Sequence, residues 1–445
     1  MNAEAAVPSS SDQSAAVLTP RQKAIEEKNP FKRFFLVLGP GLITGASDDD
    51  PSGIGTYSVA GASLGFSTLW LAIVTLPMMA AVQYSCAKIG MVTGQGLSGV
   101  LRKNYPRPLL YLAVISLFVA NTLNVGADIG AIAAAIELLH PVPILPTILL
   151  VSIAILVVQV MGSYKLIANV FKWLTLVLFA YIATAFFVHV DVGQVLKATF
   201  VPTVQPTAEF ASTLVAILGT TISPYLFFWQ ASQQVEEDKS EGKRALWQRR
   251  GASHEELKVA AMDVNAGMIL SNLVMYFIIF TCAATLHAHG QTHIVSATDA
   301  AKALVPVAGK FSELLLAIGL IGTGLLAIPI LTGSAAYAMS EAFGWRYGLD
   351  EKPYRAKQFY AVIAVSTIAG MAMNFFGMNA ISALFWSAVI NGLVAPPLLV
   401  LIMLVVNNKE IMGDKVNSPM TNVLGWASTV AMTVAAVALF FTWGK

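Results

Sequence analysis

The sequence predicts a polytopic α-helical membrane protein, and three observations support this fold class. Of the 445 residues 56% are hydrophobic and only 12% are charged, and the mean hydropathy is +0.69. Soluble domains are about one quarter charged, so an interior this apolar in so long a chain indicates lipid as its solvent. The apolar residues also form windows of roughly 20 residues, the length that crosses a bilayer. The third observation is the placement of the basic residues.

Eleven apolar windows follow one another along the chain, and we expect each to be a membrane helix. They cover residues 34–63, 67–89, 108–136, 143–162, 167–189, 210–235, 260–284, 312–342, 358–374, 379–406 and 421–443. Residues 1–30 are polar and lack the basic start and apolar centre of a signal peptide, which predicts a disordered cytoplasmic tail. Residues 31–445 are expected to form a single transmembrane domain.

Lysine and arginine are distributed in a way that supports this topology. With a cytoplasmic N-terminus and a crossing at each window, 23 of the 27 basic residues face the cytoplasm. The four on the outside are Lys197, Lys302, Lys310 and Lys445. Cytoplasmic loops of membrane proteins carry such an excess, and one missed helix would destroy it. We therefore expect a multi-pass protein of the plasma (inner) membrane, with its N-terminus in the cytoplasm.

Two of the windows are interrupted near their middles. Three aspartates, a proline and a glycine stand at residues 48–53 of the first window, and residues 219–224 contain Pro224 in the sixth. One proline usually only kinks a membrane helix. Two breaks five helices apart indicate inverted repeats around a central binding site. We expect repeat one in residues 31–190, repeat two in 208–406 and an additional helix in 421–443.

The first break contains the consecutive carboxylates Asp48, Asp49 and Asp50. An ionised carboxylate inside the membrane is costly unless it faces water, a partner or a cation. An unwound segment can direct one carboxylate inward and expose its own carbonyl oxygens, which together suit a hard cation. We expect one aspartate to be a ligand and the others to cap half-helices or attract the cation, and the residues alone leave open which is which.

The second break offers only oxygen ligands. Thr220, Thr221, Ser223 and Tyr225 stand there with the freed carbonyls, and Met, Cys and His are lacking at its centre. An all-oxygen set suits Mg²⁺, Ca²⁺ or Mn²⁺ rather than softer metals. Mg²⁺ binds through few protein ligands and keeps several waters, so a site poor in side-chain ligands is compatible with it.

These motifs resemble those of the Nramp family of divalent-metal transporters. Gly39-Pro40-Gly41 followed by Asp50-Pro51-Ser52-Gly53 is similar to the family's GPG-to-DPGN first helix. Gly90-Met91-Val92-Thr93-Gly94 with Leu97 resembles the family's G-x-V-T-G-x-x-L signature. Ser223-Pro224-Tyr225 stands where the family has Met-Pro-His. The resemblance implies the inverted-repeat fold shared with amino-acid/sodium symporters and alternating access to a central metal.

Several positions depart from the family pattern. Asp50 matches a family ligand, but Gly53 replaces the ligand asparagine, Ser223 the selectivity methionine and Tyr225 the proton-linked histidine. The pattern resembles the Nramp-related magnesium transporter branch, which implies a roomier site, a largely hydrated Mg²⁺ and uncoupled transport.

In the third helix, Asn124 and Ala127 stand where the family carries its acidic proton-relay pair, and Asp128 lies one residue further. Asp128 would then pair with a neighbouring helix or cap one. In the tenth helix, Asn391 is either a ligand of the ion or its water, or an interhelical hydrogen-bonding residue, with Gly392 allowing close packing.

The predicted metal site comprises Asp50, Gly53, Thr220, Ser223, Asp49 and Asn391, supported by Asp48, Tyr225, Pro51 and Pro224. We expect a transporter of hard divalent cations with Mg²⁺ as its cargo and Mn²⁺ as a competitor. It would need the lipid bilayer but neither a resident cofactor nor nucleic acid, and the transport unit would be monomeric.

Two alternatives remain: a proton-coupled Mn²⁺/Fe²⁺ transporter, and a sodium-coupled symporter of a small solute with the same fold. Three aspartates at the break disfavour the symporter. An enzyme is not expected, because the six histidines all lie near or outside the membrane boundaries and leave no catalytic constellation at membrane depth.

Overall fold

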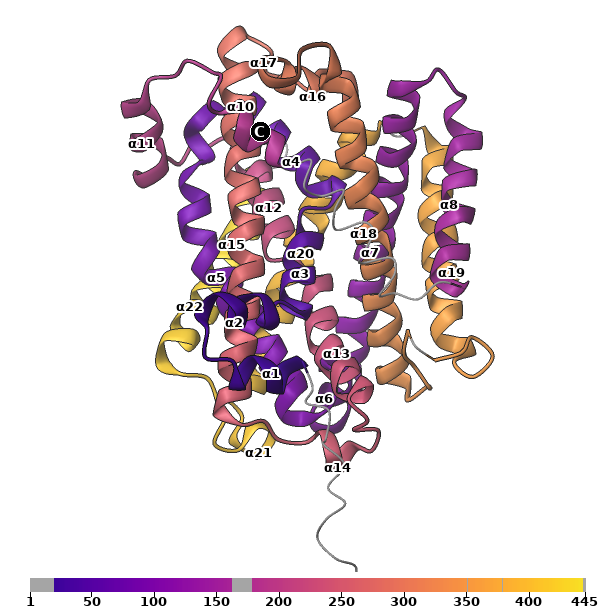
Figure 1. The fold of residues 1–445 in the computed structure, drawn as a ribbon. Helices are drawn as coiled ribbons and strands as arrows, with labels where there is room; N and C mark the ends of the chain where they lie inside the picture. Colours follow the sequence, from indigo (N-terminus) through magenta and orange to yellow (C-terminus); the bar gives the residue numbers. More distant parts are fainter. Residues whose placement is uncertain (1–19, 162–177, 350, 378, 443–445) are drawn as a thin grey trace, which may run out of the picture.

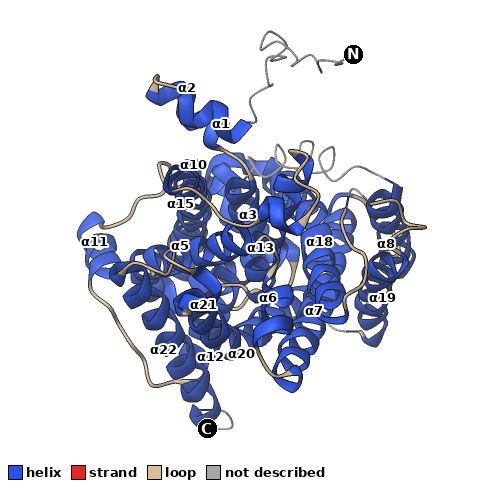
Figure 2. Ribbon diagram, turned by 90° about the horizontal axis from the view of Figure 1, so that it is seen from below, coloured by secondary structure: helices blue, strands red, loops and turns tan. Residues whose placement is uncertain are grey.

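The computed structural model describes residues 20–161, 178–349, 351–377 and 379–442. Most of these residues are helical, and the long helices run side by side between the two ends of the bundle in Figure 1. Figure 2 shows many of the same helices end-on, packed around α3, α13 and α18, and no strand is drawn among the described residues. An all-helical polytopic architecture, as the sequence predicts, is confirmed.

The first half of the chain contains the helices up to residue 200. They are α1 (Pro20–Glu26), α2 (Pro30–Val37), α3 (Pro40–Asp48), α4 (Pro51–Leu64), α5 (Trp70–Thr93), α6 (Leu97–Asn104), α7 (Arg107–Leu139), α8 (Ile144–Met161), α10 (Phe179–Thr184) and α11 (Val192–Phe200).

The second half repeats the pattern of long helices joined by short ones. Its helices are α12 (Ala208–Thr221), α13 (Pro224–Ser240), α14 (Leu246–Arg249), α15 (His254–Thr285), α16 (Ala297–Ala301), α17 (Val305–Ala308), α18 (Ser312–Phe343), α19 (Lys357–Met373), α20 (Ala380–Asn407), α21 (Lys409–Met412) and α22 (Pro419–Thr442).

Nine stretches among the described residues are long and apolar enough to cross a membrane, and one of them spans both α12 and α13. The first predicted helix, which its break divides into α3 and α4, is not among them. Of the fifth window, 167–189, residues 167–177 lie outside the described residues. Eleven crossings therefore stay a prediction.

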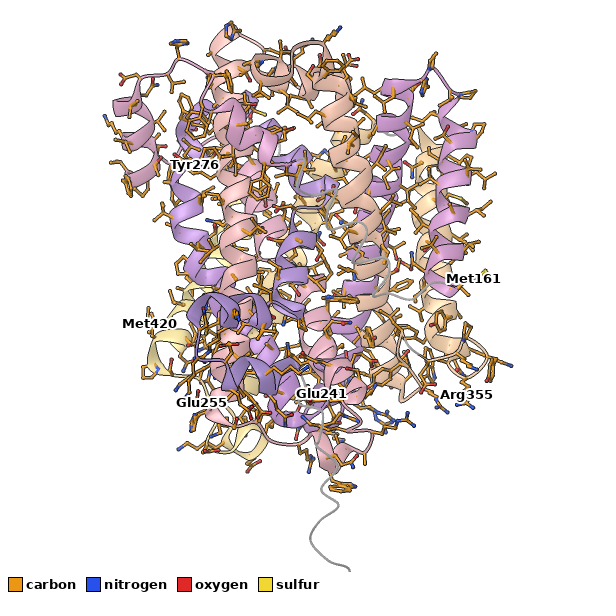
Figure 3. The ribbon with its side chains drawn as sticks, in the orientation of Figure 1. Met161, Glu241, Glu255, Tyr276, Arg355 and Met420 are labelled. Atoms are coloured by element: carbon orange, nitrogen blue, oxygen red, sulfur yellow. The ribbon has the colours of Figure 1, made fainter. Side chains whose placement is uncertain are left out.

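Side-chain exposure separates a lipid-facing surface from the ends of the bundle. On α8, Leu150 and Ile153 are exposed along the outer face, and an apolar surface of this extent suits acyl chains. Figure 3 places Met161 at the end of α8 on the same outer side. The charged side chains Glu241 and Arg355 lie at the lower end of that view, as expected for a water-exposed end.

The N-terminal region differs from expectation at one place. Residues 20–26 fall within the predicted disordered tail but form helix α1. These seven residues pack against α2 and α15, which gives this polar segment contacts that its composition does not reveal. Residues 1–19 of the tail lie outside the described part.

Glycines bring the broken helices close to their neighbours. A Cβ added at Gly45 of α3 would overlap the carbonyl of Gly267 on α15, and one at Gly41 would lie 2.6 Å from the backbone nitrogen of Val264. On the other side, a Cβ at Gly219 of α12 would overlap the backbone of α20. Close packing of backbones through small residues is a common way to assemble membrane helices, and here it fixes both breaks in the centre of the bundle.

Candidate metal centre

The break in the first helix lies between α3, which ends at Asp48, and α4, which begins at Pro51. Asp50 is the N-cap of α4: its Oδ1 accepts the backbone N–H of Gly53 at 2.7 Å. Aspartate at the N-cap and proline at the first helical position are both favoured at such a start. The other oxygen, Oδ2, accepts Nδ2 of Asn124 on α7 at 2.9 Å. Two hydrogen bonds thus hold a fully buried carboxylate in one orientation.

Asp48 and Asp49 face a different helix. The hydroxyl of Ser271 on α15 donates to Oδ2 of Asp48 at 2.7 Å and lies 3.4 Å from Oδ1 of Asp49. Oδ1 of Asp48 is buried and accepts no hydrogen bond from a described residue. The break therefore directs Asp50 towards α7 and its two neighbours towards α15. Asp49 and Asp50 as ligands and Asp48 as a supporting residue stay predictions.

The break in the sixth helix lies between α12 and α13. Ser223 is the N-cap position of α13 and Pro224 its first residue. The Ser223 hydroxyl donates to the carbonyls of Gly219, at 3.1 Å, and Thr220. Hydroxyl and carbonyl oxygens therefore lie together at this break, and these are the types of ligand that the sequence offers there.

Two hydrogen bonds join the breaks to each other. Oγ1 of Thr220 donates to the phenol oxygen of Tyr57 on α4 at 2.9 Å. The Tyr225 hydroxyl donates to the carbonyl of Ser47 on α3, also at 2.9 Å. Each half of the sixth helix thus contacts one half of the first, which places the two sets of oxygens around a common centre.

Gly53 lies where a side chain would enter this centre. A Cβ built on it would lie 3.3 Å from the carbonyl oxygen of Asp48 and 3.5 Å from Oδ1 of Asp50. A side chain at this position would therefore contact the residues of the break. The glycine itself adds no side-chain ligand there.

Asn391 lies buried on α20, and its amide oxygen accepts no hydrogen bond from a described residue. The adjacent Gly392 packs against α12, since an added Cβ would overlap the carbonyl of Val215. The close packing allowed by the sequence is present, and the role of Asn391 as a ligand stays a prediction.

The charges at the centre lack basic partners among the described residues. The described ion pairs all lie outside the breaks. The two buried bases bind backbone oxygens elsewhere: Lys88 that of Val416 and Arg249 that of Gly94. In the part of the chain that is described, no three His, Cys, Asp or Glu side chains form a metal-binding group. A cation here would thus also use carbonyl, hydroxyl and amide oxygens, or water.

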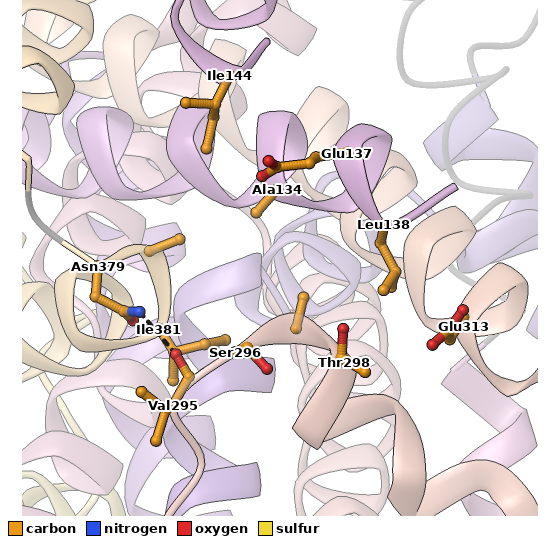
Figure 4. A pocket seen from close by; sticks show the side chains of 12 residues that line it. Ala134, Glu137, Leu138, Ile144, Val295, Ser296, Thr298, Glu313, Asn379 and Ile381 are labelled. Atoms are coloured by element: carbon orange, nitrogen blue, oxygen red, sulfur yellow. Dashed lines mark hydrogen bonds between the residues drawn. The ribbon is translucent and has the colours of Figure 1, made fainter. Parts of the chain in front are cut away.

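Cavities lie on two sides of the buried centre. One of about 450 Å³, shown in Figure 4, is bordered by Glu137, Glu313 and Asn379 at the ends of α7, α18 and α20. An apolar cluster of Ala127, Ala131, Ile381, Ala383 and Leu384 continues from it along α7 and α20. A Cβ on Gly55 of α4 would lie 3.0 Å from Leu384, so this cluster closes on the first helix just beyond the break.

The second cavity, of about 140 Å³, lies at the N-terminal end of α3, on the other side of the buried centre. It is bordered by Gly39, Gln234, Glu237 and Asp263, among others. The site residues between the two cavities are all buried, at 3% exposure or less for Asp48, Asp49, Asp50 and Thr220. The structure therefore shows the centre closed towards both ends.

Sequence reasoning missed side chains that bind the residues of the two breaks. Ser271, the partner of Asp48, and Tyr57, the partner of Thr220, stand in apolar helices without any motif. Asn124 stands out in the sequence only for the acid it replaces. What these residues share is that they are polar, buried and at a similar depth on different helices. This pattern can be recognised only once it is known which helices pack together.

Two broken helices packed break against break, with buried oxygens and carboxylates between them, are the architecture of a membrane transporter. Comparison with known proteins identifies which kind. A family model described as "Natural resistance-associated macrophage protein-like" (Nramp) matches residues 41–442. The chain belongs to the Nramp family, and it is a divalent metal cation transporter rather than an enzyme.

Its sequence relatives include proteins named "Divalent metal cation transporter MntH". The one from Deinococcus radiodurans is 25% identical over 419 residues, 93% of this chain and 90% of the relative. The one from Yersinia pestis is 26% identical over 409 residues, 89% of this chain and 93% of the relative.

Solved structures show the same fold. A manganese transporter of Eremococcus coleocola superposes with a TM-score of 0.75 at 18% identity, covering 94% of this chain and 90% of that one. Mhp1, a nucleobase-cation-symport-1 family transporter, gives 0.52 at 15% identity, with 91% and 92% covered. At these identities the likeness concerns the fold alone, and it confirms the transporter architecture implied by the broken helices.

Proposed function

We propose that this Nramp-family protein carries hard divalent cations, with Mg²⁺ as the favoured cargo, by alternating access and without proton coupling. The observation that carries the proposal is that the candidate ligands gathered at the two breaks are oxygens. Ser223 presents a hydroxyl, not a thioether, at the helix-six break, and hard oxygen donors suit Mg²⁺, Ca²⁺ and Mn²⁺.

The shortage of side-chain ligands beside Asp50 favours an ion that keeps part of its water. Gly53 has no side chain to offer as a ligand. Mg²⁺ gives up its hydration water reluctantly and is usually held by one or two carboxylates with several waters. Asp50, the Thr220 carbonyl and Ser223 would form the protein side of such a site, with Asp48 and Asp49 adding negative charge.

Uncoupled transport is proposed because of what surrounds the carboxylate. Asn124 donates its amide to Asp50 at 2.9 Å, and an amide cannot take up a proton in the range where carboxylates and histidines do. Tyr225 occupies the position after Pro224, and its hydroxyl is bound to the Ser47 carbonyl. Neither residue offers an obvious proton carrier.

Alternating access is supported by the two cavities at opposite ends of α3 and α7, with the buried centre between them. We further propose inverted repeats in residues 31–190 and 208–406, a cytoplasmic N-terminus and a monomeric transport unit. Mn²⁺ is the second candidate cargo, because the MntH relatives are divalent metal cation transporters and an oxygen site also accepts Mn²⁺.

Uptake into proteoliposomes of the purified protein tests the proposal. Mg²⁺ should enter saturably, Mn²⁺ should compete, and an internal pH dye should register no proton entry. Asp50→Ala should abolish uptake, whereas Asp414→Ala, at an exposed loop, should behave like the unsubstituted protein. Proton entry in step with the metal would favour the coupled Mn²⁺/Fe²⁺ transporter. Sodium-dependent uptake of an organic solute without metal entry would refute the proposal altogether.

A further inference from the structure

Asp128 is a buried carboxylate that the proposed site has not used. It lies near the middle of the membrane helix α7 and has 0% exposure. A carboxylate at this depth is costly unless something compensates it. The sequence leaves two ordinary explanations, pairing with a neighbouring helix or capping one.

Pairing is not what the described residues show. Neither carboxylate oxygen of Asp128 accepts a hydrogen bond of ordinary geometry, and none of the described ion pairs includes it. Its electrostatic neighbours are the carboxylate of Asp50 and the backbone N–H of Ser52, which is the second residue of α4. The charge of Asp128 thus lies beside another negative charge.

Contacts on α18 place Asp128 next to the helix-one break. A Cβ added at Gly324 would lie 2.7 Å from Cδ1 of Ile132 and 3.2 Å from Cγ of Pro51. Ile132 is one turn beyond Asp128 on α7, and Pro51 follows Asp50. Three helices therefore meet within one turn of the Asp128 carboxylate.

Asp128 continues a row of acceptors along one face of α7. Asn121, Asn124 and Asp128 are spaced three and four residues apart, so their side chains lie on one side of the helix. The amide nitrogens are engaged: that of Asn121 with the Leu331 carbonyl at 2.9 Å, and that of Asn124 with Asp50. These partners are acceptors, which fixes the amide orientations.

The oxygens of this row accept no hydrogen bond of ordinary geometry from the described residues. Oδ1 of Asn121, Oδ1 of Asn124 and both oxygens of Asp128 are buried without a partner among the described residues. Buried acceptors without donors are destabilising, and their cost is removed by a bound cation or by a hydrated one that donates its water protons.

We propose that Asp128 is a second carboxylate ligand of the transported divalent cation, so that the ion is held between Asp50 on the first helix and Asp128 on the third. This inference rests on the proposed function. The ligation is direct or through one water of the hydrated ion, with Oδ1 of Asn124 between the two carboxylates. A second carboxylate beside Asp50 attracts a divalent ion more strongly than a monovalent one, because the Coulomb energy scales with the charge of the ion.

The competing explanation is that Asp128 only stabilises the positive end of α4 at Ser52. The two roles predict opposite effects for Asp128→Asn, a change that removes the charge but keeps the size. A ligand that is uncompensated without its ion destabilises the apo protein, so its neutralisation should leave the apo melting temperature unchanged or raise it. A capping charge stabilises the apo protein, so its loss should lower that temperature.

The experiment is titration calorimetry with MgCl₂ and MnCl₂ on the purified full-length protein, together with thermal unfolding with and without metal. For Asp128→Asn we expect at least about tenfold weaker binding, which is about 1.4 kcal/mol, and a smaller rise of the melting temperature with metal. Asp128→Glu should retain more affinity than Asp128→Asn, because it keeps the charge.

The matched control is Thr122→Val on the same helix. Thr122 contacts Ser366 of α19 at 3.0 Å, away from the break, so its removal perturbs α7 without touching the centre, and metal affinity should be unchanged. Should Asp128→Asn fail to fold, Asp128→Ser replaces it in the same measurements.

Unchanged metal affinity in the Asp128 variants overturns the inference, as does a lowered apo melting temperature with unchanged affinity. Failure of the proposed function looks different: the unsubstituted protein would then bind neither metal. If it binds Mn²⁺ but not Mg²⁺ and Asp128→Asn weakens Mn²⁺, Asp128 is a ligand and only the choice of cargo is wrong.

Discussion

The first half of the first broken helix, α3, and the first half of the second broken helix, α12, both lead to a break, but they are anchored differently. The start of α3 is held by Asp263 of α15, whose Oδ1 accepts the N–H groups of Gly39 at 2.8 Å and Leu42 at 3.0 Å. Its Oδ2 accepts that of Gly41 at 2.6 Å. α12 instead caps itself.

At the start of α12, the N–H of Phe210 donates to Oγ1 of Thr207, the residue just before the helix, at 3.2 Å. A cap of this kind travels with its own helix. The cap of α3 belongs to a helix more than 220 residues away in the chain. The difference indicates that the start of α3 moves together with α15. The cap of α12, in contrast, does not bind its start to another helix.

The largest effect is expected from Asp263→Ala. This change removes the clamp on α3, by which we mean the three hydrogen bonds from the start of α3 to the Asp263 carboxylate. Three N–H groups at the start of α3 would lose a charged acceptor, which costs about 3 kcal/mol after partial rehydration. We expect a clear fall of the melting temperature in detergent and a strong loss of metal uptake. Asp414→Ala at the exposed loop serves as the control. An unchanged melting temperature for Asp263→Ala would remove the basis of the comparison.

A smaller effect is expected from Ser223→Met, which changes the chemistry of the helix-six break while the clamp on α3 stays intact. A thioether is a soft ligand, so Cd²⁺ should bind about tenfold more tightly, or about 1.4 kcal/mol. Calorimetry with CdCl₂ and MgCl₂ measures the shift. If Cd²⁺ binding does not improve, Ser223 does not face the ion.

The smallest effect is expected from Thr207→Ala, the counterpart of the clamp on α12. Loss of one N-cap hydroxyl costs about 1 kcal/mol. The melting temperature should fall by much less than for Asp263→Ala, and metal affinity should stay the same. A loss as large as that of Asp263→Ala would show that the two half-helices are anchored equally firmly.

Local sequence signals predicted the fold well. The window 312–342 corresponds to α18 at Ser312–Phe343, and the breaks fall where Pro51 and Pro224 start new half-helices. Apolar length and proline are properties of neighbouring residues, so they can be recognised without knowing the fold. The helix at Pro20–Glu26 escaped prediction because its stability comes from packing against α2 and α15.

The partners of the site could not be predicted in the same way. Ser271 reaches Asp48 across 223 residues, and Asp263 reaches Gly41 across 222. Each is an isolated polar residue in an apolar run, which signals importance but not the identity of its partner. The division of three adjacent aspartates between α7 and α15 follows from helix pairing, which sequence periodicity does not contain.

The three aspartates at the first break also bear on how the protein is assembled. Each aspartate at the centre of an inserting helix opposes membrane entry by about 2.5 to 3.5 kcal/mol. The partners that receive them, Asn124 and Ser271, are made later than the helix itself, since synthesis proceeds from the N-terminus. We therefore expect the first helix to reach its final depth only after α7 and α15 have entered the bilayer, so the acids that would serve transport would also delay its insertion.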